Sequence, residues 1–113
     1  MAKGATLVPT QVYVSALTGS SVTVLYAWRA SAKVTIKNFK DAAVQGAAVR
    51  GNFIWGGRSV GYVTASTGIC TITSGNISTS NLSTTFKVVS VTGTNLSYDA
   101  SRNTQSSVKI LKP

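Results

Sequence analysis

The sequence of 113 residues contains no histidine, two acidic residues and one cysteine. Without histidine, a Ser-His-Asp or Cys-His catalytic site and a histidine-ligated metal centre are excluded. The two acids, Asp41 and Asp99, are far apart in the chain, and Asp41 falls in a predicted turn, so a glycosidase pair is not expected. Because active sites need paired titrating groups, we expect a protein that is not an enzyme and holds no metal or cofactor.

A single cysteine cannot form an internal disulfide, so cysteine usage leaves the redox compartment open. No basic residue adjoins Cys70, and the sequence therefore predicts a small buried side chain there and not an activated thiol. The longest apolar runs are only a few residues, so no membrane insertion is expected. The segment after Met1 lacks the apolar region of a signal peptide, and we expect a fragment or a mature chain without its leader.

Hydrophobic residues make up 43% of the chain, which is enough for one folded core at this length. We expect one domain over residues 1–113, with residues 1–6 as a flexible N-terminal segment. Serine, threonine, valine and glycine are abundant, whereas glutamate, glutamine and leucine are scarce. This composition is typical of β-strands and their turns.

Residues 28–37 carry the clearest strand pattern, because apolar and polar side chains alternate with a period of two. The face predicted to be buried consists of Trp28, Ala30, Ala32, Val34 and Ile36. The face predicted to meet solvent consists of Arg29, Ser31, Lys33, Thr35 and Lys37. Lysine on a strand can also protect an exposed sheet edge from pairing with other chains, and this is the structural alternative to a binding role.

Similar patterns and turn signals predict about seven or eight short strands. Residues 17–21 are predicted to be a loop, and residues 96–98 are predicted to continue the strand of residues 85–91. In the first strand, Val12, Val14 and Ala16 share the inward parity. The predicted strand regions are 5–17, 22–37, 49–55, 59–64, 70–73, 85–91, 96–98 and 108–110. Residues 22–37 are long enough for one bent strand or two short ones. This arrangement favours an all-β, immunoglobulin-like or fibronectin III-like β-sandwich.

Residues 47–72 form the centre of this prediction, with a hairpin turn at Gly56–Gly57. Phe53 and Trp55 share one parity, so both are predicted to be core residues. The alternative for Trp55 is a place at the hairpin tip beside Arg58, where its ring could stack on a sugar.

A set of short segments recurs here in the order and spacing of a known family, although no single segment is specific. The segments are residues 32–36, 44–49, 51, 53–57, 64–70, 85–88, 91–93, 96–99 and 112–113. From about Trp28 to Pro113 the chain resembles the immunoglobulin-like or fibronectin-like accessory domains at the C-termini of secreted bacterial hydrolases, notably subtilisin-like proteases. The resemblance implies a secreted, non-catalytic module of a larger protein.

The chain departs from that family at three places. Tyr62 stands where the family often has a second cysteine, and Ala65 stands where it commonly has an acid. Asp99 is followed by no acid, although the family has an acid-rich segment there. A calcium site is therefore not expected, because calcium needs several oxygen ligands including carboxylates.

Eleven lysine or arginine residues give a net charge of +9, which attracts nucleic acids, acidic glycans and other anionic polymers. The alternative is that this charge serves solubility alone. The cations predicted to bind an anionic ligand are Arg29, Lys33, Lys37, Arg50, Arg58 and Lys87.

Three functions stay open from the sequence. The first is an extracellular accessory or adhesion module that binds a cell surface or a polymer, with Tyr13, Tyr26, Trp55 and Tyr62 as aromatic candidates for carbohydrate. The second is a basic nucleic-acid-binding β-domain, although the chain has no RNP-like or helix-turn-helix motif. The third is a structural unit of a fibre, pilus or multidomain stalk.

Overall fold

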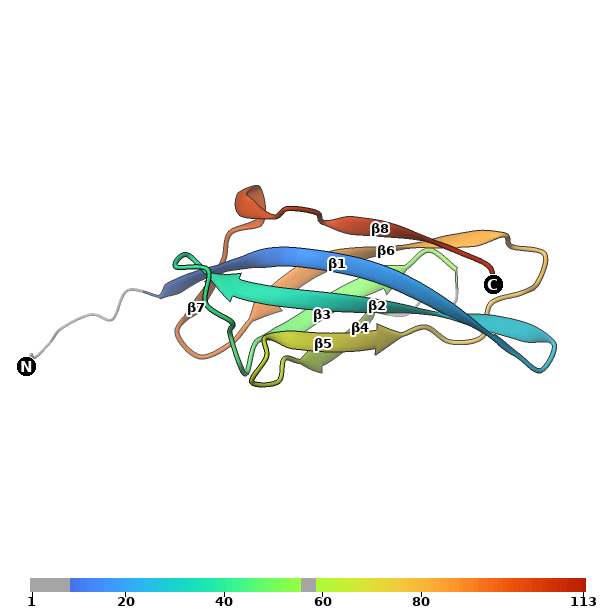
Figure 1. Ribbon diagram of the computed structural model, residues 1–113, viewed down its shortest axis with the longest axis horizontal. Helices are drawn as coiled ribbons and strands as arrows, with labels where there is room; N and C mark the ends of the chain where they lie inside the picture. The colour runs from blue at the N-terminus through green and yellow to red at the C-terminus, as the bar shows by residue number, and fades with distance from the viewer. Residues whose placement is uncertain (1–8, 56–58) are drawn as a thin grey trace, which may run out of the picture.

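The computed structural model describes residues 9–55 and 59–113, with the backbone alone for residues 59–61. The expected flexible segment 1–6 and the turn at Gly56–Gly57 therefore lie outside the described residues. The described chain forms eight β-strands and one 3-10 helix (Figure 1). These are β1 (Thr10–Val24), β2 (Ala27–Asn38), β3 (Ala48–Phe53), β4 (Ser59–Val63), β5 (Ile69–Thr73), β6 (Ser83–Thr92), β7 (Leu96–Tyr98), η1 (Ala100–Arg102) and β8 (Ser107–Leu111).

The strands form two four-stranded sheets, which confirms the all-β prediction and the expected number of strands. Sheet A has the order β5-β2-β1-β7, and sheet B has the order β4-β3-β6-β8. All pairs are antiparallel except β1 and β7, which pair in parallel. The two sheets face each other across the core, as in a β-sandwich (Figure 1). In this described part, no helix is long and apolar enough to cross a membrane.

The core lies between the sheets and follows the predicted alternation of β2. All five β2 residues predicted to be buried are buried, and the alternate residues meet solvent to varying degrees. Trp28 is the largest fully buried side chain, and its indole N–H donates to the backbone oxygens of Ser78 and Asn81, each at 3.1 Å. Because a buried indole N–H needs an acceptor, these two bonds hold the loop before β6 against the core.

The prediction of a loop at residues 17–21 was wrong, because β1 continues through them. A register irregularity near Ser15 turns Leu17 into the core and leaves Ala16 exposed, against the expected inward parity of Ala16. The β1–β2 ladder then runs on to the pair Val24–Ala27. Residues 22–37, predicted as one bent strand or two short ones, are therefore divided by a two-residue turn between the end of β1 and the start of β2.

The prediction that residues 96–98 continue the strand before them was wrong. These residues cross to the other sheet, where they form β7. A turn around Asn95, whose φ is 57°, reverses the chain, and the backbone oxygen of Asn95 accepts a 2.7 Å bond from the amide of Thr10. The hydrogen bonds of the parallel pair with β1 determine this position, and they join segments more than eighty residues apart.

We predict that Gly51→Ala destabilises the domain, since a Cβ at this position would lie 2.2 Å from Cζ of Phe86 and 2.6 Å from the backbone oxygen of Lys87. Overpacking of this kind costs about 1–3 kcal/mol, which urea unfolding would measure as a lower free energy of unfolding. The neighbouring change Asn52→Ala, at an exposed position of the same strand, is the control and should stay within about 0.5 kcal/mol. Equal losses in the two variants would contradict this account.

Candidate binding surface

Three of the predicted cations lie in a row on the outer face of sheet A. Arg29, Lys33 and Lys37 alternate with buried residues of β2, so their side chains leave the sheet on the side away from the core. We call these three residues the cationic stripe. Successive members are four residues apart, which corresponds to about 13 Å along a strand.

Hydroxyl groups lie beside the middle of the stripe on both neighbouring strands. Lys33 lies between Thr18 of β1 and Thr71 of β5, and the two threonines are exposed. Ser31 lies between Ser20 and Thr73 in the next outward row. These serine and threonine side chains were not part of the predicted site, because their position beside the cations depends on strand register.

The first cation of the stripe is held by a contact within the protein. Nε of Arg29 donates to Oδ1 of Asn76 at 2.8 Å. The next residue, Ile77, forms a β-bridge with Trp28. In the row beside it, the hydroxyls of Ser31 and Thr73 lie 3.1 Å apart and share a hydrogen bond. The face is therefore partly organised before any ligand arrives.

The remaining predicted cations do not join the stripe. Arg50 of β3 and Lys87 of β6 are exposed on the outer face of sheet B, on the opposite side of the molecule. Lys109 of β8, which was not among the predicted ligand-binding cations, is also exposed there. Arg58 lies outside the described residues. The structure thus separates the predicted basic residues into two surfaces.

The core prediction for Trp55 was wrong, because half of its side chain is exposed, at 50%. Strand β3 ends at Phe53, and Ile54 and Trp55 both face solvent beyond that end. The hydroxyl of Thr84 accepts a bond from the Trp55 amide at 3.0 Å and donates to the Trp55 oxygen at 3.1 Å. The Thr84 hydroxyl thus takes the place of a backbone partner at Trp55. The inward and outward alternation of β3 therefore does not extend to Trp55. Phe53 is buried against Phe86 as predicted.

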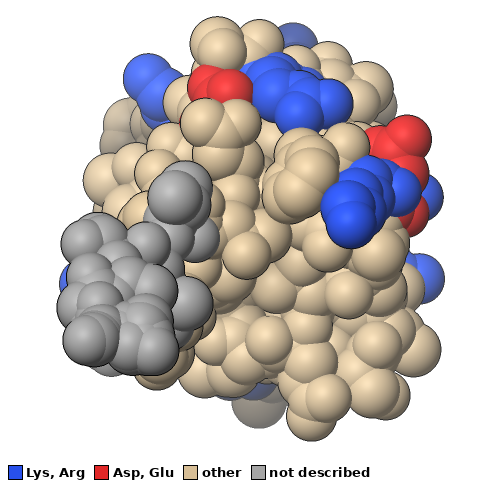
Figure 2. Space-filling model, turned by 90° about the vertical axis from the view of Figure 1, so that its left-hand side faces the viewer, with Lys and Arg blue, Asp and Glu red and all other residues tan. Residues whose placement is uncertain are grey.

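Both acids lie at the end of the molecule where β1 begins and β2 ends. Asp41, at a φ of 61°, accepts a short hydrogen bond from the hydroxyl of Tyr13. This bond, burial and the charge of Asp41 raise the pKa of Tyr13 above its usual value, while Arg102 over the ring lowers it. Asp99 accepts from the amide and hydroxyl of Ser101 and so caps η1. Figure 2, which views this end, shows acidic side chains beside cationic ones.

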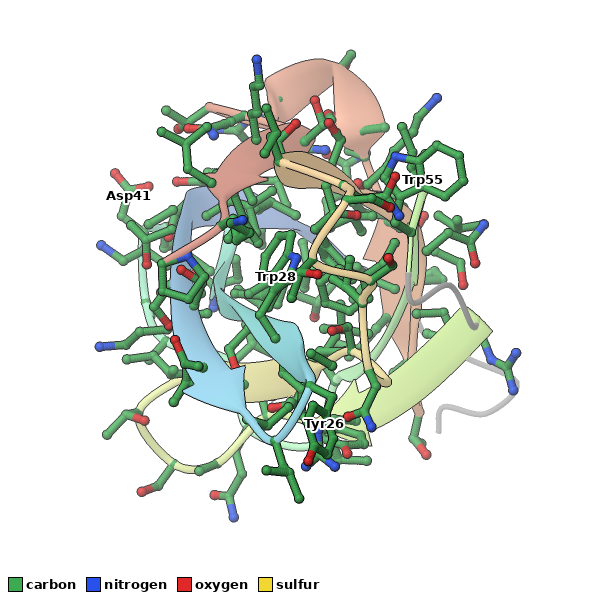
Figure 3. All side chains as sticks on the ribbon, turned by 90° about the vertical axis from the view of Figure 1, so that its right-hand side faces the viewer. Tyr26, Trp28, Asp41 and Trp55 are labelled. Atoms are coloured by element: carbon green, nitrogen blue, oxygen red, sulfur yellow. The ribbon has the colours of Figure 1, made fainter. Side chains whose placement is uncertain are left out.

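The four aromatic residues proposed for carbohydrate binding are not on one surface. Tyr13 is only 8% exposed and is covered by Arg102. Tyr26 lies in the β1–β2 turn, whereas Tyr62 lies on β4 of the other sheet. Figure 3 views the turn end and shows Tyr26 and Trp55 at different places on its rim, with Trp28 between them. The geometry therefore provides no continuous aromatic platform.

No protein-family model matches this chain, and no curated protein or solved structure shows significant similarity to it.

Within residues 9–55 and 59–113, no three metal-ligating side chains of the His, Cys, Asp and Glu types come together. Cys70 of β5 is buried in the core between the two sheets, as the sequence predicted. Burial raises the pKa of its thiol from 9.0 to about 11. At neutral pH the group is a protonated apolar side chain.

We predict that Cys70 reacts with Ellman's reagent at pH 8 about 100-fold more slowly in the native protein than in urea. The raised pKa reduces the thiolate fraction by about that factor, and only the thiolate attacks. Raising the pH through 9 and 10 should speed the native reaction, because the thiolate fraction keeps increasing below pH 11. Equal rates in native and unfolded protein would show that the thiol is accessible and ionised.

Proposed function

We propose that this chain is an immunoglobulin-like, non-catalytic binding module of an extracellular protein, and that it binds an anionic polysaccharide through the outer face of sheet A. The observation that carries the proposal is the cationic stripe of Arg29, Lys33 and Lys37 on a strand face without acids. Both acids of the chain lie in segments outside the strands of that face. A polyanion lying along β2 would meet positive charge at Arg29 and Lys33, while the carboxylate of Asp41, bound to Tyr13, lies beside the Lys37 end of the stripe.

The hydroxyls beside the stripe favour a polysaccharide. A sugar polymer presents hydroxyl groups as well as carboxylates or sulfates, and serine and threonine can both donate to and accept from such groups. Thr18 and Thr71 on either side of Lys33 provide these contacts on neighbouring strands. The cations would pair with the anionic groups through charge-assisted hydrogen bonds.

Nucleic acid is the second candidate and is less well supported. Single-stranded nucleic acid is bound by a basic groove together with aromatic rings on which bases stack. Within strands β1 and β2 the outward-facing aromatic residue beside the stripe is Tyr13, which is buried under Arg102 and engaged with Asp41. Phosphate contacts alone would give binding that is weak, salt-sensitive and independent of sequence.

We predict that Lys33→Gln/Lys37→Gln weakens binding to heparin or polygalacturonate roughly tenfold at low salt. Each exposed charge contact contributes about 0.5–1 kcal/mol, so two lost contacts correspond to this factor. The matched control is Lys87→Gln/Lys109→Gln, which removes the same charge from the outer face of sheet B. Calorimetry or fluorescence anisotropy at two salt concentrations would compare both variants with the parent.

The control variant should keep affinity within about threefold of the parent, as expected for charges remote from the ligand. Equal losses in the two variants would show a general charge effect and would overturn the assignment to sheet A. Absence of binding to either polysaccharide at low salt would overturn the polysaccharide proposal itself. Tighter binding to single-stranded DNA than to both polysaccharides would favour the nucleic-acid candidate.

A further inference from the structure

The turn between β1 and β2 presents large apolar side chains to solvent. Leu25 is 80% exposed and Tyr26 is 89% exposed, and Val22 is exposed one row behind them. We call these three residues the apolar tip. Neither Leu25 nor Tyr26 contributes to the core, so packing within the domain does not explain their size.

The backbone at the apolar tip also favours a smaller residue. Tyr26 has a φ of 62°, a left-handed conformation that glycine adopts freely and that is unusual for a bulky side chain. The turn is nevertheless rigidly supported, because Trp28 behind it is buried and bonded to the loop before β6. An aromatic ring is thus held in solvent at a position where folding alone would be better served by glycine.

The charges of the molecule are arranged unevenly along the hairpin. Asp41 and Asp99 lie near the first residues of the ladder, about 40 Å from the apolar tip by strand length. Near the tip the charged side chains are cations: Arg29 pairs across the strands with Val22, and Lys112 lies by the base of the hairpin. The tip end is therefore apolar and positive.

A small pocket of about 180 Å³ opens beside the base of the hairpin. It is lined by Thr23, Ala27, Trp28, Thr79, Lys112 and Pro113. Nζ of Lys112 donates to the backbone oxygen of Thr79 at 3.1 Å, which keeps the ammonium group at the pocket. The ammonium group of Lys112 has further N–H donors that can pair with a phosphate oxygen.

We propose that this end of the domain docks on an anionic phospholipid bilayer. Leu25 and Tyr26 enter the interfacial layer, and Arg29 and Lys112 contact the phosphates of the headgroups. Tyrosine suits this depth because its ring is apolar and its hydroxyl remains hydrated. The docking is peripheral and needs no membrane-spanning segment.

Charge and shape distinguish a bilayer from the other occupants of such a surface. A second copy of this chain meeting tip to tip would bring Arg29 and Lys112 of both copies together, with a net charge of +9 on each molecule. A folded partner would need a ready-made cavity for a convex tip, whereas a fluid bilayer closes around it. Two apolar side chains and a few cations give reversible binding that requires anionic lipid.

The experiment is sedimentation with vesicles of phosphatidylcholine alone and of phosphatidylcholine mixed with phosphatidylglycerol. The parent protein should bind the mixed vesicles more tightly than the neutral ones, and salt should weaken that binding. Leu25→Ser/Tyr26→Ser should lose at least about tenfold in affinity for the mixed vesicles, since two buried apolar side chains are removed. The matched control is Phe39→Ser/Tyr62→Ser, which removes two exposed aromatic residues elsewhere and should bind like the parent.

Tyr26→Gly separates binding from folding. Glycine relieves the left-handed backbone, so this variant should unfold at a temperature no lower than the parent and still bind vesicles more weakly. Equal affinity of the parent for neutral and mixed vesicles would overturn the proposal, as would parent-like binding by the tip variants. A dimer of the parent that Leu25→Ser/Tyr26→Ser abolishes in analytical ultracentrifugation would assign the tip to a second copy instead.

This outcome is independent of the polysaccharide proposal. The tip variants retain Lys33 and Lys37, so they should bind heparin or polygalacturonate like the parent. Failure of vesicle binding with intact polysaccharide binding would overturn the lipid proposal alone, and the reverse pattern would overturn the polysaccharide proposal alone.

Discussion

The antiparallel ladder between β1 and β2 decides which side chains of sheet A enter the core and which meet solvent. It joins residues from Val12 to Val24 with residues from Ala27 to Asn38. Because side chains on a strand alternate between its two faces, this one ladder directs Trp28 and its apolar companions into the core. The same alternation directs Arg29, Lys33 and Lys37 outward. A shift of one residue in register would exchange the two sets, so the core and the cationic stripe are determined together.

The features that could be predicted from the sequence are those that depend on local periodicity. The alternation of β2 was predicted correctly on both faces, and so were the burial of Phe53 and Cys70 and the number of strands. These positions follow from a period of two within a few residues and from the apolar character of each side chain. The cations of the stripe could be selected for the same reason.

The predictions that failed depend on contacts between distant segments. Ala16 and Leu17 exchange faces because of a register irregularity in the β1–β2 ladder, and no local pattern marks its position. Trp55 turns outward because the hydroxyl of Thr84, twenty-nine residues away, binds its backbone. The division of the cations between two opposite faces likewise depends on the sheet to which each strand belongs. Sequence periodicity gives the parity of a residue within its strand and cannot give the sheet or the partner.

Both acids lie at one end of the molecule, and this position determines where its surface is positively charged. Asp41 is engaged by Tyr13, and Asp99 caps η1, so each acid serves the structure at the end where β1 begins. The turn end and the Arg29–Lys33 part of the stripe consequently carry cations away from both acids, whereas Lys37 lies near Asp41. Both proposed surfaces also share β2, since Arg29 lies at the point where the stripe meets the hairpin turn. With the turn end on a bilayer, the stripe would run away from the lipid along β2, and a polysaccharide bound there would extend outward from the membrane surface.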